Sequence, residues 1–289
     1  MRRSKLIREY LSLALKVSRV RFWFYLAGPF TVGYVWGAQR FIDLWNLEFF
    51  SFLFYFMLPA NILLYGVNDY WDYDTDRLNP KKGGKEHLVR DEEKGRLVVI
   101  LGVSVAISVL LMILQCDLVE RLILASFLFL SYFYSAKPLR FKATPILDFS
   151  SNILYLIPGI LAFHQAIGHL PSLWVILAAF LHSSAMHIFS AIPDILWDTR
   201  VGIRTTAVLM GARVSTVLCF IFWTLFSGIV IIIGGFSLIS FISLIYPLMI
   251  VYLWTRRMKP GSTYWAYPYI NTGLGGLLFF LGAFRIPFA

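Results

Sequence analysis

The feature that most constrains the fold of this chain is a succession of long apolar segments. A helix needs roughly 20 predominantly apolar residues to cross a bilayer. Nine such segments follow one another, at residues 22–39, 49–67, 97–115, 119–136, 146–164, 171–193, 214–234, 236–254 and 266–284. Transmembrane barrels show short alternating segments instead of continuous apolar runs. The sequence therefore predicts an all-α, polytopic membrane bundle of nine transmembrane helices.

The composition agrees with a membrane protein. Of the 289 residues, 58% are hydrophobic and only 15% are charged, and the mean hydropathy is +0.71. A soluble domain of ordinary composition would carry about 25% charged residues. The longest polar stretch covers only residues 77–96, so we expect one transmembrane domain over residues 1–289 and no separate soluble domain.

Lys and Arg residues are divided very unevenly between the expected loops. Of the 26, 23 lie in the N-terminal tail or in the loops after the second, fourth, sixth and eighth segments, and the opposite side keeps Arg40, Arg121 and Arg285. Because cytoplasmic loops are enriched in Lys and Arg, we expect the N-terminus in the cytoplasm and the C-terminus outside. The net charge of +10 then suits anionic lipid headgroups, and we expect no nucleic-acid partner.

Two short acidic clusters stand out against this basic background. The first runs from Asn68 to Asp76 and the second from Asp194 to Asp198, and together they hold six of the 16 acidic residues. Each cluster follows a strongly apolar segment, and the predicted topology places both on the cytoplasmic side. Carboxylates are costly near a bilayer and usually mark a functional site.

The spacing of these residues suits a metal site. Asn68, Asp72 and Asp76 are four residues apart, which stacks them on one helix face, and Asp69 borders that face. The two aspartates of the second cluster repeat this spacing. Mg²⁺ prefers oxygen ligands and is commonly held by a few carboxylates together with substrate phosphates. The predicted Mg²⁺ ligands are Asn68, Asp69, Asp72, Asp76, Asp194 and Asp198. Of these, we expect Asp72, Asp76 and Asp198 to be catalytic.

Basic side chains near the clusters suit a diphosphate. Arg binds phosphate through two parallel hydrogen bonds, whereas Lys acts as a point charge. Arg19 and Arg200 are among the neighbouring basic residues. The residues that we assign to diphosphate binding are Arg21, Lys137, Arg140, Lys142 and Arg204. Each of them also fits the ordinary excess of positive charge in cytoplasmic loops.

Two further polar residues have open roles. His187 lies seven residues before Asp194, so it either lines a substrate cavity and takes up a proton or is a buried, hydrogen-bonded histidine. Asp148 begins the fifth apolar segment. It is either an additional acidic group of the site or a helix N-cap, and we expect the cap.

Three motifs carry a family resemblance. Asn68-Asp69-x-x-Asp72-x-x-x-Asp76 matches an NDxxDxxxD motif, Asp194-x-x-x-Asp198 matches a second aspartate motif, and residues 134–142 (YSAKPLRFK) resemble a YSxxPxRxK segment. With them, the chain resembles the UbiA superfamily of intramembrane prenyltransferases over essentially its whole length. Residues 18–23, 66–82 and 202–207 look most like the carotenoid branch, the lycopene elongases, although Val20 stands where proline is expected.

The resemblance implies Mg²⁺-dependent transfer of a prenyl group from an allylic prenyl diphosphate to a hydrophobic, lipid-soluble acceptor, with lycopene or another carotenoid expected. It also implies an integral protein of a prokaryotic inner membrane whose active site faces the cytoplasm. A quinone or chlorin precursor is the alternative acceptor. A carrier of cations or polyprenyl phosphates is the alternative of another class, but transporters usually place acidic groups at the bilayer midplane.

Overall fold

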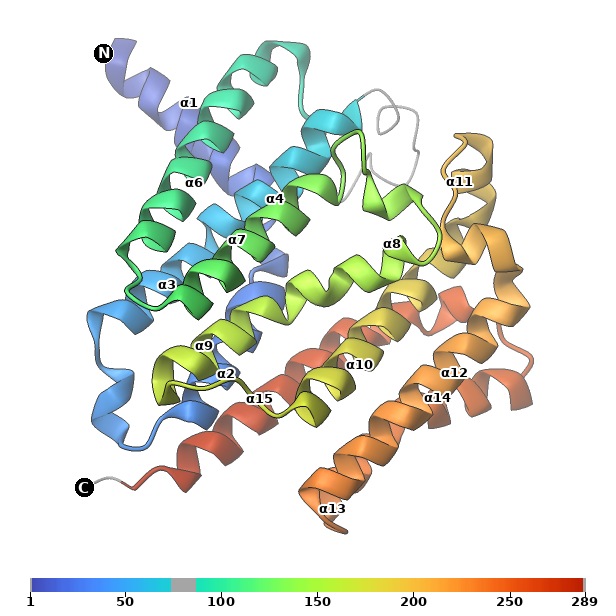
Figure 1. Cartoon of the computed structure of the whole chain (residues 1–289). Helices are drawn as coiled ribbons and strands as arrows, with labels where there is room; N and C mark the ends of the chain where they lie inside the picture. The colour runs from blue at the N-terminus through green and yellow to red at the C-terminus, as the bar shows by residue number, and fades with distance from the viewer. Residues whose placement is uncertain (1, 74–86, 288–289) are drawn as a thin grey trace. The chain divides into compact units, whose positions relative to one another are not determined.

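A computed structural model describes residues 2–73 and 87–287, and its regular structure is helical (Figure 1). The described residues form no β-strand. The helical segments that are long and apolar enough to cross a membrane are Leu47–Trp71, Asp91–Leu114, Leu173–Arg200, Thr206–Gly234 and Leu238–Thr255. The predicted all-α class is therefore confirmed. The predicted count of nine spans and their orientation stay predictions.

The chain divides into two compact units. The first contains the residues up to Arg140, the segment Ile157–Leu170 and the residues from Leu277 onward. The second contains Phe141–Leu156 and Pro171–Gly276. Each unit therefore draws on separate parts of the chain. The predicted single domain over residues 1–289 stays a prediction.

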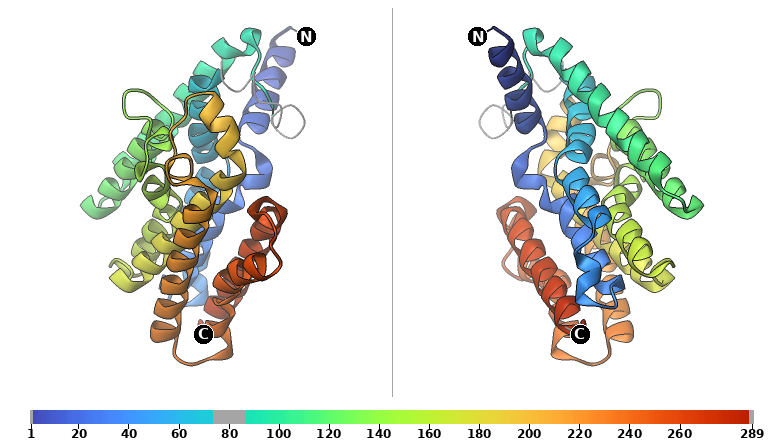
Figure 2. Two further views of the ribbon diagram at one scale, coloured as in Figure 1. Left: turned by 90° about the vertical axis from the view of Figure 1, so that its right-hand side faces the viewer. Right: turned by 90° about the vertical axis from the view of Figure 1, so that its left-hand side faces the viewer.

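The described residues of the first unit form seven complete helices. They are α1 (Arg2–Val17), α2 (Phe24–Gly37), α3 (Leu47–Met57), α4 (Pro59–Trp71), α6 (Lys94–Leu114), α7 (Leu118–Phe133) and α9 (Ile157–Ile167). Figures 1 and 2 show α1, in blue, beside α4 and α6, with which it is in contact. The last helix of the chain, α15 (Tyr267–Arg285), contributes its second half to this unit.

Helix α1 occupies most of the basic segment that was expected to be an N-terminal tail. Its buried residues Leu13 and Val17 pack against Ile62 of α4 and Leu97 of α6. Leu13 and Val17 are four residues apart, which places them on one face of a helix. This apolar spacing is present in the sequence. It is hard to recognise there because many Lys and Arg residues lie between the apolar ones.

The second predicted span is divided between α3 and α4. Pro59 begins α4 and has no backbone N–H, so the regular helical hydrogen bond is lost at that point. The side-chain amide of Asn61 donates instead to the carbonyl oxygens of Phe56 and Met57, at 2.6 and 3.0 Å. Such replacement is what allows a broken helix to persist at membrane depth. The break sets the direction of α4, which carries the first acidic cluster.

Helices α2 and α9 approach each other through glycine. A Cβ atom added to Gly33 would overlap the backbone carbonyl group of Gly159, and one added to Gly159 would lie 3.0 Å from the carbonyl oxygen of Pro29. Small residues allow this backbone-to-backbone packing between membrane helices. The crossing of α2 and α9 therefore requires glycine at position 33.

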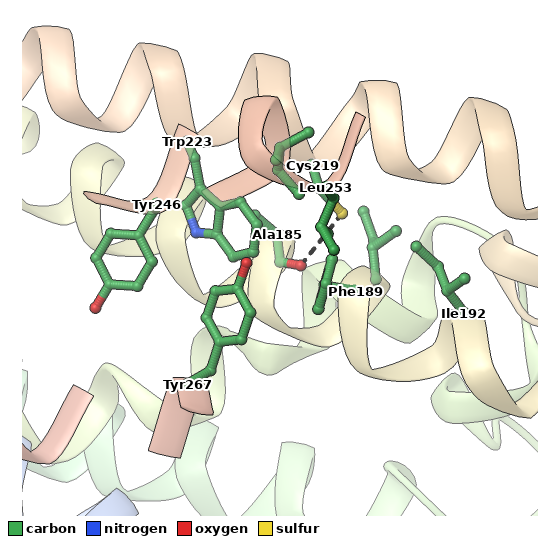
Figure 3. Packing of buried hydrophobic residues seen from close by; sticks show 10 residues of the cluster. Ala185, Phe189, Ile192, Cys219, Trp223, Tyr246, Leu253 and Tyr267 are labelled. Carbon is green, nitrogen blue, oxygen red and sulfur yellow. Dashed lines mark hydrogen bonds between the residues drawn. The ribbon is translucent and has the colours of Figure 1, made fainter. Parts of the chain in front are cut away.

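The second unit is organised around two long helices that pack along each other, α10 (Leu173–Ala191) and α12 (Thr206–Gly234). Its other elements are α8 (Leu147–Ser150), η5 (Ser151–Tyr155), η6 (Ile192–Asp194), α11 (Ile195–Arg200), α13 (Leu238–Ile242), α14 (Ile245–Thr255) and the first half of α15. A buried cluster that includes Phe189, Trp223, Tyr246 and Tyr267 forms its core (Figure 3).

Two predicted boundaries can be compared with this unit. Helix α12 ends at Gly234, and Gly235 has a positive φ of 72°, which glycine adopts readily, so the tight turn predicted at this glycine pair is confirmed. The fifth predicted span, residues 146–164, is not one helix. It consists of α8, the 3₁₀ segment η5 and then α9, whose second residue is Pro158.

Candidate functional site

The first acidic cluster lies where α4 ends. Asn68 and Asp69 belong to the last turn of this helix, and Asp72 follows its last residue, with its N–H still bonded to the carbonyl of Asn68 at 2.9 Å. Asp69 and Asp72 are buried, with 7% and 4% of their surface exposed. The expected helical stacking therefore holds from Asn68 to Asp72. Asp76 lies outside the described residues.

Each of the two buried aspartates forms an ion pair with a distant arginine. Arg19 Nη2 donates to Asp69 Oδ1 at 2.6 Å, across 50 residues of sequence. Arg140 Nη2 donates to Asp72 Oδ1 at 2.9 Å, across 68 residues. A buried carboxylate is tolerated when it is paired and hydrogen-bonded. The first unit thus brings two carboxylates and two guanidinium groups together at the end of α4.

Both arginines have an unusual backbone. Arg19 has φ 51° and Arg140 has φ 38°, in the left-handed region that residues with a Cβ rarely occupy. The Arg19 guanidinium also lies 4.7 Å from the centre of the Tyr65 ring, a cation–π contact with α4. Uncommon backbone conformations of this kind persist when surrounding contacts impose them, and they are concentrated at functional sites.

Three more contacts hold the end of α4 in place. The Asn68 side-chain amide donates to Ser135 Oγ at 3.1 Å. The Tyr73 hydroxyl donates to Asp91 Oδ1 at 2.5 Å, and Lys94 Nζ lies 3.4 Å from the centre of the Tyr73 ring. Tyr73 therefore links the first acidic cluster to Asp91, three residues before α6, and to Lys94, the first residue of α6.

The donor atoms of the first cluster fit Mg²⁺ in chemical kind. Asp69 and Asp72 offer carboxylate oxygens, and the Asn68 amide oxygen is available while its nitrogen donates to Ser135. Within residues 2–73 and 87–287, no three His, Cys, Asp or Glu side chains converge into a group that could hold a metal ion. The arginine-paired carboxylates of Asp69 and Asp72, together with Asn68, are the part of the first cluster's predicted metal ligands that the structure describes.

The predicted diphosphate ligands have different surroundings. Arg140 is brought to Asp72, as described above. Arg21, Lys137 and Arg204 are exposed, and Lys142 is half-buried in the 3₁₀ segment η4 (Phe141–Ala143). Arg19 was noted beside the clusters but was not assigned to the site, although it pairs with Asp69. No local signal in the sequence distinguishes Arg19 from Arg21, because the distinction arises from packing against α4.

The second acidic cluster belongs to the second unit. Asp194 ends η6, Asp198 lies in α11, and both side chains are half-buried. The chain is helical from Leu173 to Arg200, through α10, η6 and α11, so the two aspartates keep the helical spacing that the sequence predicted. The backbone carbonyl of Asp198 accepts a hydrogen bond from the N–H of Ile203 at 2.8 Å, which closes α11.

Asp148 is a helix cap, as expected, but of a different helix. Its carboxylate accepts hydrogen bonds from the backbone N–H of Thr206, at 2.7 Å, and from the Thr206 hydroxyl, at 2.5 Å. Thr206 is the first residue of α12. The fully buried Asp148 thus satisfies the start of α12, 58 residues away, rather than the start of α8.

Comparisons with known proteins identify the family and the fold. Residues 26–281 match the UbiA prenyltransferase family. Two proteins named lycopene elongase/hydratase, from Haloferax volcanii and Halobacterium salinarum, are each 39% identical over 92% of this chain, which corresponds to 87% and 94% of their own lengths. The structure of a UbiA homolog from Archaeoglobus fulgidus, bound to GPP and Mg²⁺, has a TM-score of 0.72. It is 20% identical and covers 93% of this chain and 99% of its own, so the two share a fold.

Proposed function

Because the chain belongs to the UbiA prenyltransferase family, we propose that it transfers an allylic prenyl group from its diphosphate to a linear carotene such as lycopene. The observation that carries the proposal is the pair of buried carboxylates, Asp69 and Asp72, each paired with an arginine at the end of α4. Carboxylates can bind the metal ion and arginines can bind the diphosphate, so the end of α4 carries both kinds of group that the reaction needs. The names of the halophilic relatives support the carotene as acceptor.

The residues that would hold Mg²⁺ are those predicted from the two motifs: Asn68, Asp69, Asp72, Asp76, Asp194 and Asp198. When bound, Mg²⁺ neutralises the diphosphate and stabilises it as a leaving anion. Arg140 lies beside Asp72 and presents a guanidinium that suits the same diphosphate. The apolar helices exclude water from the allylic cation, which would otherwise be quenched before it reached the acceptor.

A carotene acceptor also suits the scarcity of general bases. A linear carotene has no hydroxyl that must be ionised before it attacks the cation. The chain has only five His residues, and the described carboxylates of the first cluster are engaged with arginines. A phenolic acceptor would be expected to need a base close to the metal.

Expression in a lycopene-producing host provides the direct test. We expect heavier carotenoids that have gained one or two C5 units, detected by mass spectrometry of extracted pigments. Membranes that prenylate a quinone precursor and leave the carotenoids unchanged would reject the carotene acceptor and keep prenyl transfer. Purified protein that binds an allylic diphosphate with Mg²⁺ but never releases diphosphate would favour a carrier.

Topology is a separate prediction. We propose nine spans with a cytoplasmic N-terminus and with both acidic clusters on the cytoplasmic side. In a background with Cys116 and Cys219 replaced by alanine, a cysteine at the exposed position Lys259 should be labelled from the cytoplasmic side. A cysteine at the exposed position His169 should be labelled from the outer side. Labelling of both positions from the same side would contradict the proposed count of spans.

A further inference from the structure

Helix α1 crosses α4 and α6 instead of running along them (Figure 1). Leu13 and Val17 of α1 pack against Leu97 and Ile100, which lie in the first two turns of α6. On α4 the contact reaches Gly66, in its last two turns, where an added Cβ atom would lie 3.1 Å from Val17 Cγ1. The segments that contain α4 and α6 are long and apolar enough to cross a membrane. Helix α1 therefore lies near one membrane surface, where α4 ends and α6 begins.

Helix α1 does not itself fit a membrane span. Its 16 residues correspond to about 24 Å, whereas the hydrocarbon core of a bilayer is about 30 Å thick. It also contains five Lys or Arg residues, which are costly at the centre of a bilayer. A short, charged helix at the ends of two spans is instead placed to lie along the membrane surface.

Helix α1 carries an apolar stripe that the rest of the described chain leaves uncovered. The stripe consists of Ile7, Leu11 and Leu15, which are 54, 62 and 47% exposed. Their four-residue spacing places them on one helix face. At about 100° per residue, this face is roughly a third of a turn from the packed face of Leu13 and Val17. An exposed apolar stripe at a membrane surface fits contact with the acyl chains of lipids.

The remaining face of α1 is basic. This basic face consists of Lys5, Arg8 and Lys16, which are exposed and lie roughly another third of a turn around the helix. Glu9 is the only acidic residue of α1, and its Oε2 lies 2.7 Å from Arg96 Nη1 of α6. Because Glu9 is paired with α6, it does not neutralise the basic face. Helices with an apolar stripe and a face of Lys and Arg bind in the interface of anionic membranes.

The end of α1 leads directly to the candidate site. Ser18 follows the last residue of α1 and is fully buried. Its hydroxyl donates to the carbonyl oxygen of Leu15 at 2.9 Å and accepts a hydrogen bond from Trp23 Nε1 at 3.1 Å. The next residue is Arg19, whose guanidinium pairs with Asp69 at 2.6 Å. Since only this fixed serine separates α1 from Arg19, the position of α1 determines whether the guanidinium reaches Asp69.

We propose that α1 is a docking helix for anionic lipid headgroups. The apolar stripe inserts below the headgroups, and the basic face binds the lipid phosphates. Docking keeps α1 seated across α4 and α6, and so holds Arg19 at Asp69. The inference rests on the proposed topology for the side of the membrane, and on the proposed function for its effect on prenyl transfer.

Fluorescence quenching tests where α1 lies. The full chain, with Cys116 and Cys219 replaced by alanine, receives an environment-sensitive fluorophore at a single new cysteine. Leu11→Cys puts the probe on the apolar stripe. Ser12→Cys, at the next exposed position and on the basic side, is the matched control. In vesicles of equal parts phosphatidylcholine and phosphatidylglycerol, we expect brominated lipid to quench the first probe and aqueous acrylamide to quench the second.

Phosphatidylglycerol should increase the lipid quenching at Leu11 relative to vesicles of phosphatidylcholine alone. A single Lys or Arg near an anionic surface typically strengthens binding about fivefold. Replacing the basic face with glutamine, which favours helix about as well as lysine, should therefore abolish most of this increase (Lys5→Gln, Arg8→Gln and Lys16→Gln). The control removes three charges from exposed positions of the second unit and should retain the increase (Arg213→Gln, Arg256→Gln and Lys259→Gln).

Diphosphate release from an allylic diphosphate and Mg²⁺ is the second readout. We expect release to be roughly fivefold faster in the mixed vesicles than in phosphatidylcholine alone, in line with the contribution of one basic residue to headgroup binding. The variant without the basic face should lose this difference. Release that ignores phosphatidylglycerol while the Leu11 probe responds to it would overturn the link between α1 and Arg19.

The fluorescence outcomes separate the docking helix from the proposed function. Equal acrylamide quenching at Leu11 and Ser12 would place α1 in water and overturn the proposal. A Leu11 probe shielded from both quenchers would show that protein, such as a second copy of the chain, covers the stripe, and would overturn it too. Lipid quenching that is unchanged by phosphatidylglycerol would reject the anionic headgroups. The expected quenching without diphosphate release in any vesicle would keep the docking helix and remove the proposed function.

Discussion

Replacing Asp72 with asparagine is expected to lower prenyl transfer by on the order of a hundredfold or more. Asp72 is a predicted metal ligand, and even residues that only orient the ligands of a metal typically contribute about 10- to 100-fold. Asparagine has almost the same shape and can still accept the hydrogen bond from Arg140, so the end of α4 should keep its structure. The measurement is diphosphate release by purified protein at saturating Mg²⁺.

Asp117→Asn is the matched control for this experiment. Asp117 is the N-cap of α7, where its side chain accepts a hydrogen bond from the N–H of Val119. Asparagine caps helices as well as aspartate does, so activity and thermal stability should both be retained. Near-normal turnover of Asp72→Asn, with a thermal unfolding midpoint equal to that of the control, would contradict the assignment of Asp72 as a ligand.

Replacing Gly33 with alanine is expected to destabilise the first unit by about 2 kcal/mol or more, because overpacking of a close contact typically costs 1–3 kcal/mol and occasionally more. The added Cβ would overlap the carbonyl group of Gly159, which belongs to the backbone and cannot rotate away. Helices α2 and α9 would have to separate. The measurement is the thermal unfolding midpoint of the detergent-solubilised protein.

Gly28→Ala, in the same helix, is the control for the effect of alanine itself. A Cβ at position 28 meets no atom within 4 Å among the described residues. Alanine favours helix over glycine by about 1 kcal/mol, so this variant should be as stable as the unmodified protein or more stable. Equal midpoints for Gly28→Ala and Gly33→Ala would show that α2 and α9 do not require the close approach at Gly33.

Much of the candidate site could be predicted because its pattern is local. Continuous apolar runs predicted an all-α membrane protein. The consecutive glycines Gly234 and Gly235 predicted the turn at which α12 ends. The spacing of Asn68, Asp69 and Asp72 follows from helical periodicity within one segment. The proline that breaks the helix at position 59 and the apolar spacing of α1 are also local features of the sequence.

The partners of these residues were decided only by the tertiary structure. The carboxylates of Asp69 and Asp72 are paired with arginines 50 and 68 residues away, and Asp148 caps a helix that begins 58 residues later. Arg19 and Arg21 contribute equally to the positive charge of the N-terminal segment, so the sequence does not distinguish them. Only packing against α4 brings the Arg19 guanidinium to the Asp69 carboxylate. The left-handed backbone at Arg19 and Arg140 is likewise unforeseeable, because neither residue is a glycine. Local periodicity therefore determined which groups form the helices and the motifs, whereas long-range packing determined which charges meet.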